Sequence, residues 1–256
     1  MKALPRLMVA PNGGRKTKAD HPALPLSMSE IIATAVDCFA AGAGGLHLHI
    51  RDRDGQHSLD AGQYRDTLDA LREAVPEMQL QITTEAIGRY SPRAQRDVVR
   101  KVHPEAVSMS LAEMLADGDE TAALRFYDHC AGSGIAVQHI LYGAADLMRM
   151  RALLDAGKIA QDHLKLLFVL GRYSADQQSN PQDLQPFQAW LADCEQQPDW
   201  AVCAFGNRET DCLAAALSCG GKARVGFENS FWNRDGSIAR SNAERVQEVK
   251  QFLPKQ

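Results

Sequence analysis

The segment SMSEIIATAVDCFAAGAGGLHLHIRD, residues 27–52, contains a helix pattern that leads directly into a strand pattern. Ser27 and Glu30 have the spacing of a capping box, which predicts the start of a helix, and the glycines that follow Ala41 predict its end. Polar and apolar residues then alternate with a period of two, which predicts a strand. The segment therefore indicates one helix-strand step of an α/β fold.

The same alternation of strand and helix patterns recurs along the chain. The candidate strands are RLMVAP, GGLHLHIRD, MQLQITTE, AVSMSL, IAVQHIL, HLKLLFVLG, WAVCAFG and ARVGFEN, starting near residues 6, 44, 78, 106, 135, 163, 200 and 223. Eight strand-helix units in 256 residues match the length and order of a (β/α)8 TIM barrel with parallel strands. We expect a single barrel domain over residues 1–256, with a doubly wound open sheet as the alternative.

The composition is typical of an ordinary globular chain, with 45% hydrophobic and 23% charged residues. A formal net charge of -4 gives no overall basic field, so a nucleic-acid partner is not expected. The apolar runs are shorter than the roughly 18 residues of a membrane span, and the proline-broken N-terminal run is not typical of a signal peptide. Six scattered cysteines without a C-x-x-C pair predict a reduced, cytoplasmic protein.

Two histidines lie one residue apart in the second candidate strand. His47 and His49 share one face of the strand, whereas Leu46, Leu48 and Ile50 share the other, because side chains alternate along a strand. We expect the leucines to face the helices and the imidazoles to face the barrel interior. Two such imidazoles can bind one metal ion, although a pair of hydrogen-bonded core histidines is the alternative.

The last candidate strand offers a third metal ligand. Arg224, Gly226 and Glu228 share one of its faces, and Gly226 is expected to leave room beneath Glu228. Taken alone, Glu228 could be only an ion-pair partner of Arg224. Two nitrogens and one oxygen with open positions are typical of a catalytic zinc site, and Mn²⁺ or Fe²⁺ suits the same ligands.

Three segments together resemble the β-keto acid cleavage enzyme family: APNGGR at 10–15, GGLHLHIRD at 44–52 and GGKARVGFEN at 220–229. The resemblance covers almost the whole chain. It implies a zinc-dependent barrel, usually a homo-oligomer (dimer or tetramer), that converts a β-keto acid and acetyl-CoA into acetoacetate and a new acyl-CoA. It also implies that His47, His49 and Glu228 hold the metal and that Arg224 is the active-site arginine.

The chain departs from the family pattern at the position of a catalytic acid. Asn229 follows Glu228 where relatives usually carry an acidic residue, and an amide can orient the arginine or a substrate but cannot take a proton. Glu85 shares a strand face with Thr83, so it could lie at the pocket and replace the lost base. A structural salt bridge is the alternative for Glu85, and Thr83 is expected to keep a substrate-binding hydroxyl.

Further substrate contacts are expected from the resemblance. Asn12 and Arg15 stand in the segment where many relatives have T-G-A-E, so a guanidinium replaces an acidic contact and favours an anionic or polar substrate group. Arg15 could equally pair with a surface carboxylate. Ser110 lies near the position where relatives place a polar contact, although serines are also common in cores.

The loops at 170–180 and 205–211 are candidate borders for CoA, because Asn207 could cap a helix whose N-terminus attracts phosphate; they could also be plain turns. Two other functions remain open. A metal-dependent hydrolase on a barrel would add further histidines, for which His139 and His163 are candidates. A non-catalytic paralogue would bind the metal and sense a keto acid or a CoA ester.

Overall fold

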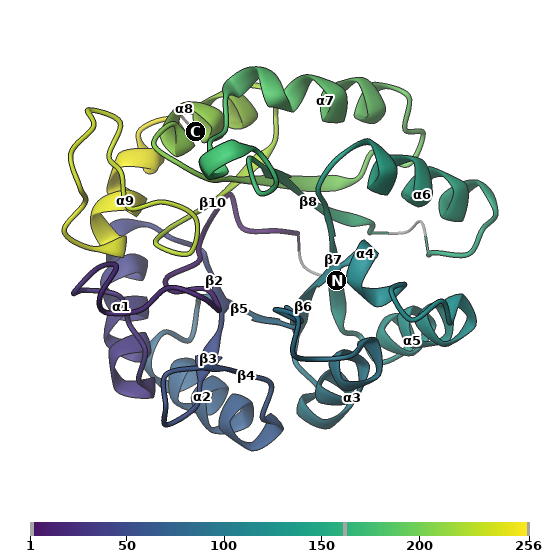
Figure 1. Cartoon of the computed structure of the whole chain (residues 1–256), viewed down its shortest axis with the longest axis horizontal. Coiled ribbons are helices and arrows are strands. Elements are labelled where there is room, and N and C mark those ends of the chain that lie inside the picture. The colour runs from purple at the N-terminus through teal and green to yellow at the C-terminus, as the bar shows by residue number, and fades with distance from the viewer. Residues whose placement is uncertain (1–2, 161–162, 255–256) are drawn as a thin grey trace.

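The computed structural model describes residues 3–160 and 163–254, which form a closed barrel of parallel strands inside a ring of helices (Figure 1). The barrel strands, in chain order, are β1 (Leu7–Val9), β2 (Gly45–Leu48), β5 (Gln79–Thr83), β6 (Ala106–Ser110), β7 (Ala136–Leu141), β8 (Lys165–Leu170), β9 (Asp199–Ala204) and β10 (Lys222–Val225). β1 pairs with both β2 and β10, which closes the barrel. The expected TIM-barrel class is confirmed. The extent of the predicted domain stays a prediction, and its residues 1–2, 161–162 and 255–256 lie outside the described residues.

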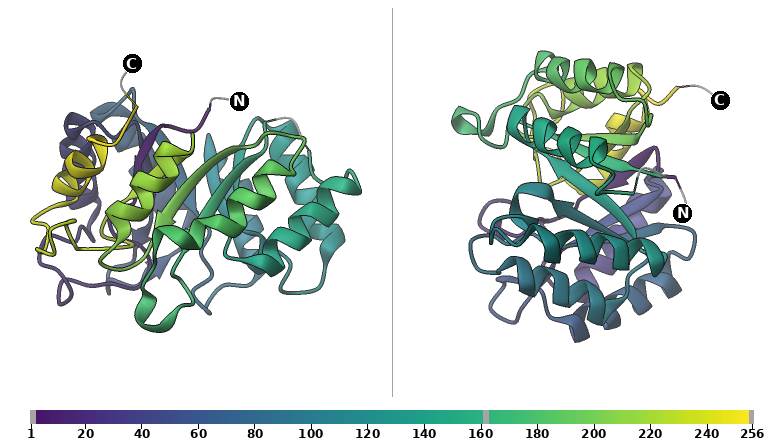
Figure 2. Two further views of the ribbon diagram at one scale, coloured as in Figure 1. Left: turned by 90° about the horizontal axis from the view of Figure 1, so that it is seen from above. Right: turned by 90° about the vertical axis from the view of Figure 1, so that its right-hand side faces the viewer.

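Helices follow the strands and cover the outside of the barrel (Figure 2). They are α1 (Met28–Ala41), α2 (Ala61–Ala74), α3 (Pro92–Val102), α4 (Leu111–Met114), α5 (Glu120–Gly132), α6 (Ala144–Asp155), α7 (Gln185–Ala192), α8 (Glu209–Ser218) and α9 (Asn242–Lys250), with 3-10 turns η1 (Ala175–Gln177) and η2 (Pro181–Leu184). The capping box of α1 is present, since the Ser27 hydroxyl accepts from Glu30 N at 3.3 Å and Glu30 Oε2 accepts from Ser27 N at 3.0 Å. None of the described helices combines the length and apolar character that a membrane span requires.

The two faces of β2 have different surroundings. Leu46 and Leu48 belong to the hydrophobic core that the strands share with the surrounding helices. His47 points the other way, where Gln81 of β5 contacts it at 2.8 Å and itself donates to Gln138 of β7 at 2.9 Å. The expected division of β2 is therefore confirmed, and a hydrogen-bonded polar layer fills the barrel below the mouth. β3 (Ile50–Arg51) and β4 (His57–Ser58) form a small hairpin after β2.

Candidate metal centre and active-site pocket

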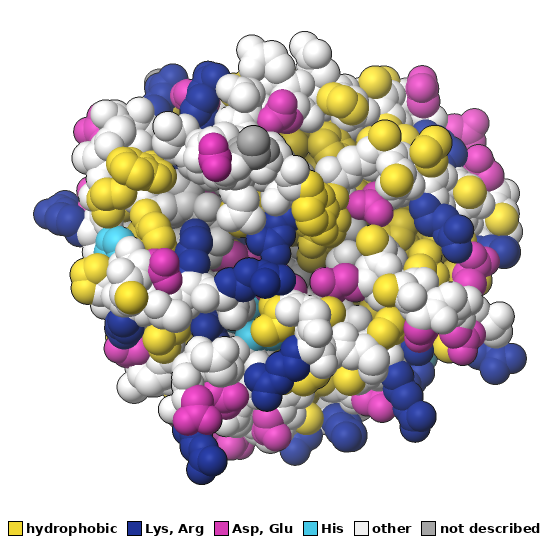
Figure 3. All heavy atoms as spheres, in the orientation of Figure 1, with side chains coloured by type: hydrophobic (Ala, Val, Ile, Leu, Met, Phe, Trp, Pro, Cys, Tyr) yellow, Lys and Arg dark blue, Asp and Glu magenta, His cyan; other side chains and the backbone are white. Residues whose placement is uncertain are grey.

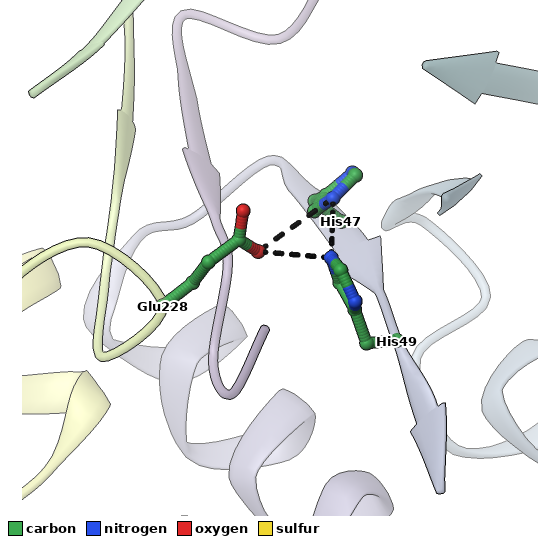
Figure 4. Close-up of side chains that lie close together, drawn as sticks. All are labelled: His47, His49 and Glu228. Carbon is green, nitrogen blue, oxygen red and sulfur yellow. Dashed lines mark hydrogen bonds and ion pairs between the residues drawn. The ribbon is translucent and has the colours of Figure 1, made fainter. Parts of the chain in front are cut away.

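The two histidines of the H-x-H segment meet at the carboxyl end of β2. His47 is in the strand and His49 comes just after it, and their Nε2 atoms lie 3.1 Å apart (Figure 4). Both side chains are 1% exposed. The amide oxygen of Gln81 can only accept, so Nδ1 of His47 carries the proton and Nε2 keeps a free lone pair. This tautomer is the one that a metal bound at Nε2 requires.

Glu228 brings a carboxylate to the same point from the turn after β10, which lies on the other side of β1 from β2 (Figure 4). Its Oε2 lies 3.2 Å from Nε2 of His49 and 3.6 Å from Nε2 of His47. Its Oε1 accepts a hydrogen bond from Arg224 at 2.9 Å, whereas the buried Oε2 has no hydrogen-bond partner among the described residues. Arg224 therefore holds one carboxylate oxygen and leaves the other directed at the imidazoles.

Two glycines shape the turn that carries Glu228. The expectation that Gly226 leaves room beneath Glu228 is wrong: Gly226 has a φ of +139°, and a Cβ there would lie 2.5 Å from the carbonyl oxygen of Ala10 and 2.9 Å from Asn242 Oδ1. Its small size allows the turn after β10 to approach the end of β1. The room beside Glu228 comes from Gly13, at φ +61°, whose added Cβ would lie 2.7 Å from Glu228 Cγ.

The three ligand atoms have the spacing that a zinc ion requires. Nitrogen and oxygen ligands at about 2.0–2.1 Å from a tetrahedral zinc ion lie about 3.3 Å from one another. The separations of 3.1, 3.2 and 3.6 Å among His47, His49 and Glu228 match one face of such a tetrahedron. These residues fit a divalent ion with an open coordination position, and their nitrogen and oxygen donors also suit Mn²⁺ or Fe²⁺.

The charge states of the ligands also favour metal binding. Burial, with the guanidinium of Arg224, lowers the pKa of His47 well below its ordinary value, so the imidazole is neutral at pH 7. Burial alone would raise the pKa of Glu228, but Arg224 and the two histidines outweigh it and hold that pKa well below its usual range. A neutral imidazole and an ionised carboxylate are the forms that bind a cation.

Arg224 of β10 supplies hydrogen-bond donors beside the metal ligands. It is 4% exposed, and its Nη2 donates to Glu228 and, at 3.3 Å, to Sγ of Cys203. Burial raises the pKa of the Cys203 thiol to about 11, so this partner stays uncharged. Nε and Nη1 of Arg224 are buried and have no partner among the described residues, so the guanidinium can still donate to an anionic ligand in the pocket.

These side chains lie in a pocket at the carboxyl ends of the strands. Lys and Arg side chains gather around a hollow in the middle of this face, with acidic side chains and a His beside it (Figure 3). Asn12, Arg15, Thr83 and Glu85 line the same pocket as the metal ligands and Arg224. The structure therefore brings together most of the residues expected from the sequence.

Glu85 lies in the pocket and also forms ion pairs, so its position is compatible with a catalytic base and with a structural salt bridge. Its Oε1 is 3.3 Å from Arg172 Nη2 and 3.9 Å from Arg15 Nε, and its Oε2 is 4.0 Å from Nδ1 of His49. The Thr83 hydroxyl accepts a hydrogen bond from Glu85 N at 3.0 Å, which fixes the backbone there. A role for Glu85 as a base stays a prediction.

Asn12 connects the loop after β1 to the metal centre. Its side-chain nitrogen donates to the carbonyl oxygens of Pro25 at 3.0 Å and His49 at 3.2 Å. Its Oδ1 is buried and has no partner among the described residues, so this oxygen is the atom that Asn12 can offer to a ligand. The structural part of its role was not expected from the sequence.

Ser110 and Asn229 do not line the pocket, although the sequence suggested both for the site. The Ser110 hydroxyl accepts from Glu113 N at 3.2 Å and so caps the short helix α4. Asn229 is 3% exposed in the turn after Glu228, and its side-chain amide has no hydrogen-bond partner among the described residues. Their substrate and catalytic roles stay predictions.

Sequence reasoning missed three cationic residues near the site. Arg51 donates through Nε and Nη2 to the carbonyl oxygen of Gly13, at 3.0 and 2.6 Å, and so holds the loop after β1. Lys16 lines the pocket and donates to the carbonyl oxygen of Phe227 at 2.8 Å, and burial lowers its pKa to about 8. Arg172 reaches the pocket from the loop after β8. The available signal was position, since each lies within a few residues of the end of a predicted strand.

The histidines expected for a hydrolase and the asparagine expected to cap a helix do not have the predicted positions. His139 of β7 packs against Tyr127 of α5, at 4.8 Å between ring centroids, and His163 precedes β8 at the opposite end of the barrel. Neither joins the metal centre, so the hydrolase alternative loses its histidines. The expected cap by Asn207 is also wrong, because α8 begins after Arg208 and has no side-chain cap hydrogen bond. Contact of these loops with CoA stays a prediction.

Comparisons with known proteins show which family the chain resembles. The sequence profile of the beta-keto acid cleavage enzyme family matches residues 6–255. A 3-keto-5-aminohexanoate cleavage enzyme of Acetoanaerobium sticklandii is 27% identical over 244 residues, which cover 93% of this chain and 87% of the relative. A 3-oxoadipate:acetyl-CoA acetyltransferase of Cupriavidus necator is 25% identical, with 95% and 86% covered.

Among solved structures, the apo structure of ObcA is similar in fold, with a TM-score of 0.71 and 17% identity. The match covers 90% of this chain but 61% of the ObcA chain, so this chain spans less than two thirds of that protein. At this identity the likeness supports the barrel fold alone.

Proposed function

This chain belongs to the β-keto acid cleavage enzyme family, and we propose that it exchanges acyl groups between a β-keto acid and acetyl-CoA. The products are acetoacetate, built from the acetyl group and carbons C1 and C2 of the acid, and a new acyl-CoA that contains the rest of the acid. The activities for which the A. sticklandii and C. necator relatives are named support this reaction class. One observation carries the proposal: the ligand atoms of His47, His49 and Glu228 are spaced as a metal ion requires, and Arg224, whose Nε and Nη1 have no partner among the described residues, lines the same pocket.

The proposed exchange balances without an oxidant or a reductant. Removal of a C2 proton lets C2 attack the carbonyl carbon of acetyl-CoA, so a C–C bond forms, the C–S bond breaks and CoA leaves as the thiolate. The thiolate then attacks ketone carbon C3 and the C2–C3 bond breaks. Acetoacetate leaves and takes up the proton at C2, while the remaining acyl group stays on CoA.

We propose that His47, His49 and Glu228 hold zinc, with Mn²⁺ and Fe²⁺ as ions that suit the same donors. When bound, such an ion would polarise the keto and carboxylate oxygens of the acid and favour loss of the C2 proton. Arg224 would donate its free N–H groups to the oxygen that gains negative charge as that proton leaves. These donors are already fixed by the ion pair with Glu228, so little reorganisation is needed.

We assign proton removal at C2 to Glu85. It is the other carboxylate that lines the pocket once Glu228 is assigned to the metal. We propose Asn12 and Thr83, which line the pocket, as substrate contacts through Oδ1 and the hydroxyl. Acetyl-CoA is the proposed co-substrate, and a homo-oligomeric state and a cytoplasmic location stay predictions.

An isotope-labelling experiment tests this function by following the acetyl carbons of acetyl-CoA into the products. Zinc-loaded protein is incubated with acetyl-CoA that carries ¹³C in both acetyl carbons and with a panel of unlabelled anionic, neutral and cationic β-keto acids. Mass spectrometry should find the label in acetoacetate and a new, unlabelled acyl-CoA. Hydrolysis of the thioester, or acetoacetate without label, would contradict the exchange.

A matched pair of variants controls the isotope experiment. His47→Phe should abolish both products, whereas His139→Phe should keep them, because His139 faces α5 outside the barrel. If both variants lose the products, the loss reflects folding, which circular dichroism would reveal. A metal-loaded wild-type protein that makes no product from any acid would instead favour a non-catalytic paralogue.

A further inference from the structure

The outer wall of the pocket is a cluster of three charged side chains: Arg15, Glu85 and Arg172. They come from the loops after β1, β5 and β8, and both arginines pair with the same carboxylate oxygen, at 3.9 Å for Arg15 and 3.3 Å for Arg172. The Arg172 side chain is 19% exposed and that of Arg15 is 56% exposed. Two guanidinium groups thus share one carboxylate.

The pocket as a whole has more positive than negative groups. Four cationic side chains and two anionic ones line it. Glu228 is paired with Arg224 and directed at the metal centre, so Glu85 is the pocket carboxylate that remains beside Arg15 and Arg172. A divalent ion at the metal centre would add to this excess. Such a field favours a ligand that carries negative charge beyond the one carboxylate common to all β-keto acids.

The outer wall lies within a short substrate's length of the metal centre. Oε2 of Glu85 is 4.0 Å from Nδ1 of His49, and the other oxygen of the same carboxylate contacts Arg172. If the reacting carboxylate and ketone occupy the inner end beside Arg224, the remaining R group must extend toward the outer wall. The group at the far end of R therefore meets the arginines.

We propose that the β-keto acid is a dicarboxylate, whose second carboxylate binds Arg172 and Arg15; this inference rests on the proposed function. A cationic R group would be repelled by the guanidinium groups, and a neutral one would accept no hydrogen bond from them. The second carboxylate also competes with Glu85 for the arginines. Its binding would release Glu85 for proton removal, which ties the rate of the reaction to recognition of the distal charge.

The test compares six-carbon acids that differ at the far end: 3-oxoadipate, 3-oxohexanoate and 3-keto-5-aminohexanoate. With zinc-loaded wild-type protein and acetyl-CoA, kcat/KM for 3-oxoadipate should exceed that for 3-oxohexanoate by about 10- to 100-fold, the range for hydrogen bonds between charged groups. Part of the difference should appear in kcat, because binding of the second carboxylate is proposed to release Glu85 for proton removal. Equal or faster turnover of the neutral or cationic acid would overturn the inference and leave the proposed function standing.

The Arg172→Gln variant tests whether the outer wall causes the preference for a dicarboxylate substrate. It should lower kcat/KM for 3-oxoadipate by about 10- to 100-fold and change that for 3-oxohexanoate by less than about 3-fold. Arg93→Gln is the control, because Arg93 lies on α3 with its side chain 87% exposed. A rise in KM for acetyl-CoA with equal losses for both acids would show that Arg172 binds CoA phosphate instead, and would overturn the inference.

A binding measurement tests the dicarboxylate preference independently of the proposed acyl exchange. Calorimetry with the unreactive acids adipate and hexanoate should show tighter binding of adipate to zinc-loaded wild-type protein, and Arg172→Gln should remove the difference. This readout does not depend on turnover. If adipate binds tightly and no acid reacts, the proposed function is wrong while the charge preference stands; equal binding of the two acids would overturn the preference.

Discussion

The metal centre and the outer wall of the same pocket differ in how firmly the chain holds them. At the metal centre, His47, His49 and Arg224 are at most 4% exposed, and Glu228 is fixed through Arg224. The outer-wall side chains are 19–56% exposed and come from loops that follow three different strands. Rigid, buried groups can stabilise one transition state, whereas longer, more exposed side chains can be replaced without disturbing the barrel.

This difference teaches where reaction and specificity reside. Under the proposed function, the metal centre acts on the C1 carboxylate and C3 ketone that every β-keto acid shares. The outer wall meets only the variable R group. We therefore expect substitutions at the metal centre to affect all substrates alike and substitutions at the outer wall to discriminate among them.

The largest effect should come from Glu228→Gln. The neutral amide is a poor metal ligand and loses the ion pair with Arg224, so we expect loss of bound zinc and a fall in kcat/KM of about 10³-fold or more for every acid. Elemental analysis and steady-state kinetics measure the two effects. Glu120→Gln, on the outer surface of α5, is the matched control and should keep both zinc and activity. Retention of activity in Glu228→Gln would break the assignment.

Arg224→Lys should separate charge from hydrogen bonding at the metal centre. Lysine keeps a positive charge near Glu228 but loses the fixed guanidinium donors, so we expect bound zinc to be retained and kcat to fall by about 10²-fold. The loss should be similar for dicarboxylate and monocarboxylate substrates. A loss confined to one acid would place Arg224 with the outer wall instead.

Arg15→Gln should have a smaller effect than Arg172→Gln. Arg15 is more exposed and lies farther from Glu85, and exposed ion pairs contribute about 0–1 kcal/mol. We expect kcat/KM for 3-oxoadipate to fall by only about 2- to 5-fold, in steady-state kinetics beside Arg172→Gln. An effect of Arg15→Gln larger than that of Arg172→Gln would reverse the order within the outer wall.

His139→Phe should change acid stability and leave the pocket intact. Burial lowers the pKa of His139 to about 4, below its ordinary value of about 6.5, so its neutral form is favoured in the folded protein. Stability from this group is complete above pH 6.5 and is lost as pH falls toward 4. The variant should reduce the acid-induced loss of unfolding free energy by up to about 3 kcal/mol, in urea titrations at several pH values. If the unfolding free energy of the variant fell with decreasing pH as steeply as that of the wild type, this account would be contradicted.

The sequence predicted the metal centre well because strand periodicity determines it. His47 and His49 had to share a face of β2, and Arg224 had to point inward from β10. Glu228 was found although β10 ends at Val225 and the residue lies in a turn, so its place at the site depends on that turn and not on strand periodicity. The role of Gly226 was misread, because its contact with Ala10 depends on another strand and cannot be seen within the segment.

The outer wall was predicted less completely because loops have no period. Arg15 and Glu85 were found through neighbouring strand ends, but the ion pairs between them and Arg172 depend on the paths of three loops. Arg172 follows β8 by two residues, and nothing in the spacing shows that it reaches Glu85. That the Ser110 hydroxyl, at a strand end, caps α4 was also not predicted.

The most direct test of the metal centre is anomalous diffraction at the zinc edge from crystals of the zinc-loaded protein. We predict a peak about 2.0–2.2 Å from Nε2 of His47, Nε2 of His49 and Oε2 of Glu228, with Arg224 still bound to Glu228 Oε1. Absence of a peak between these three atoms at full zinc occupancy, or zinc bound by other residues, would contradict the account.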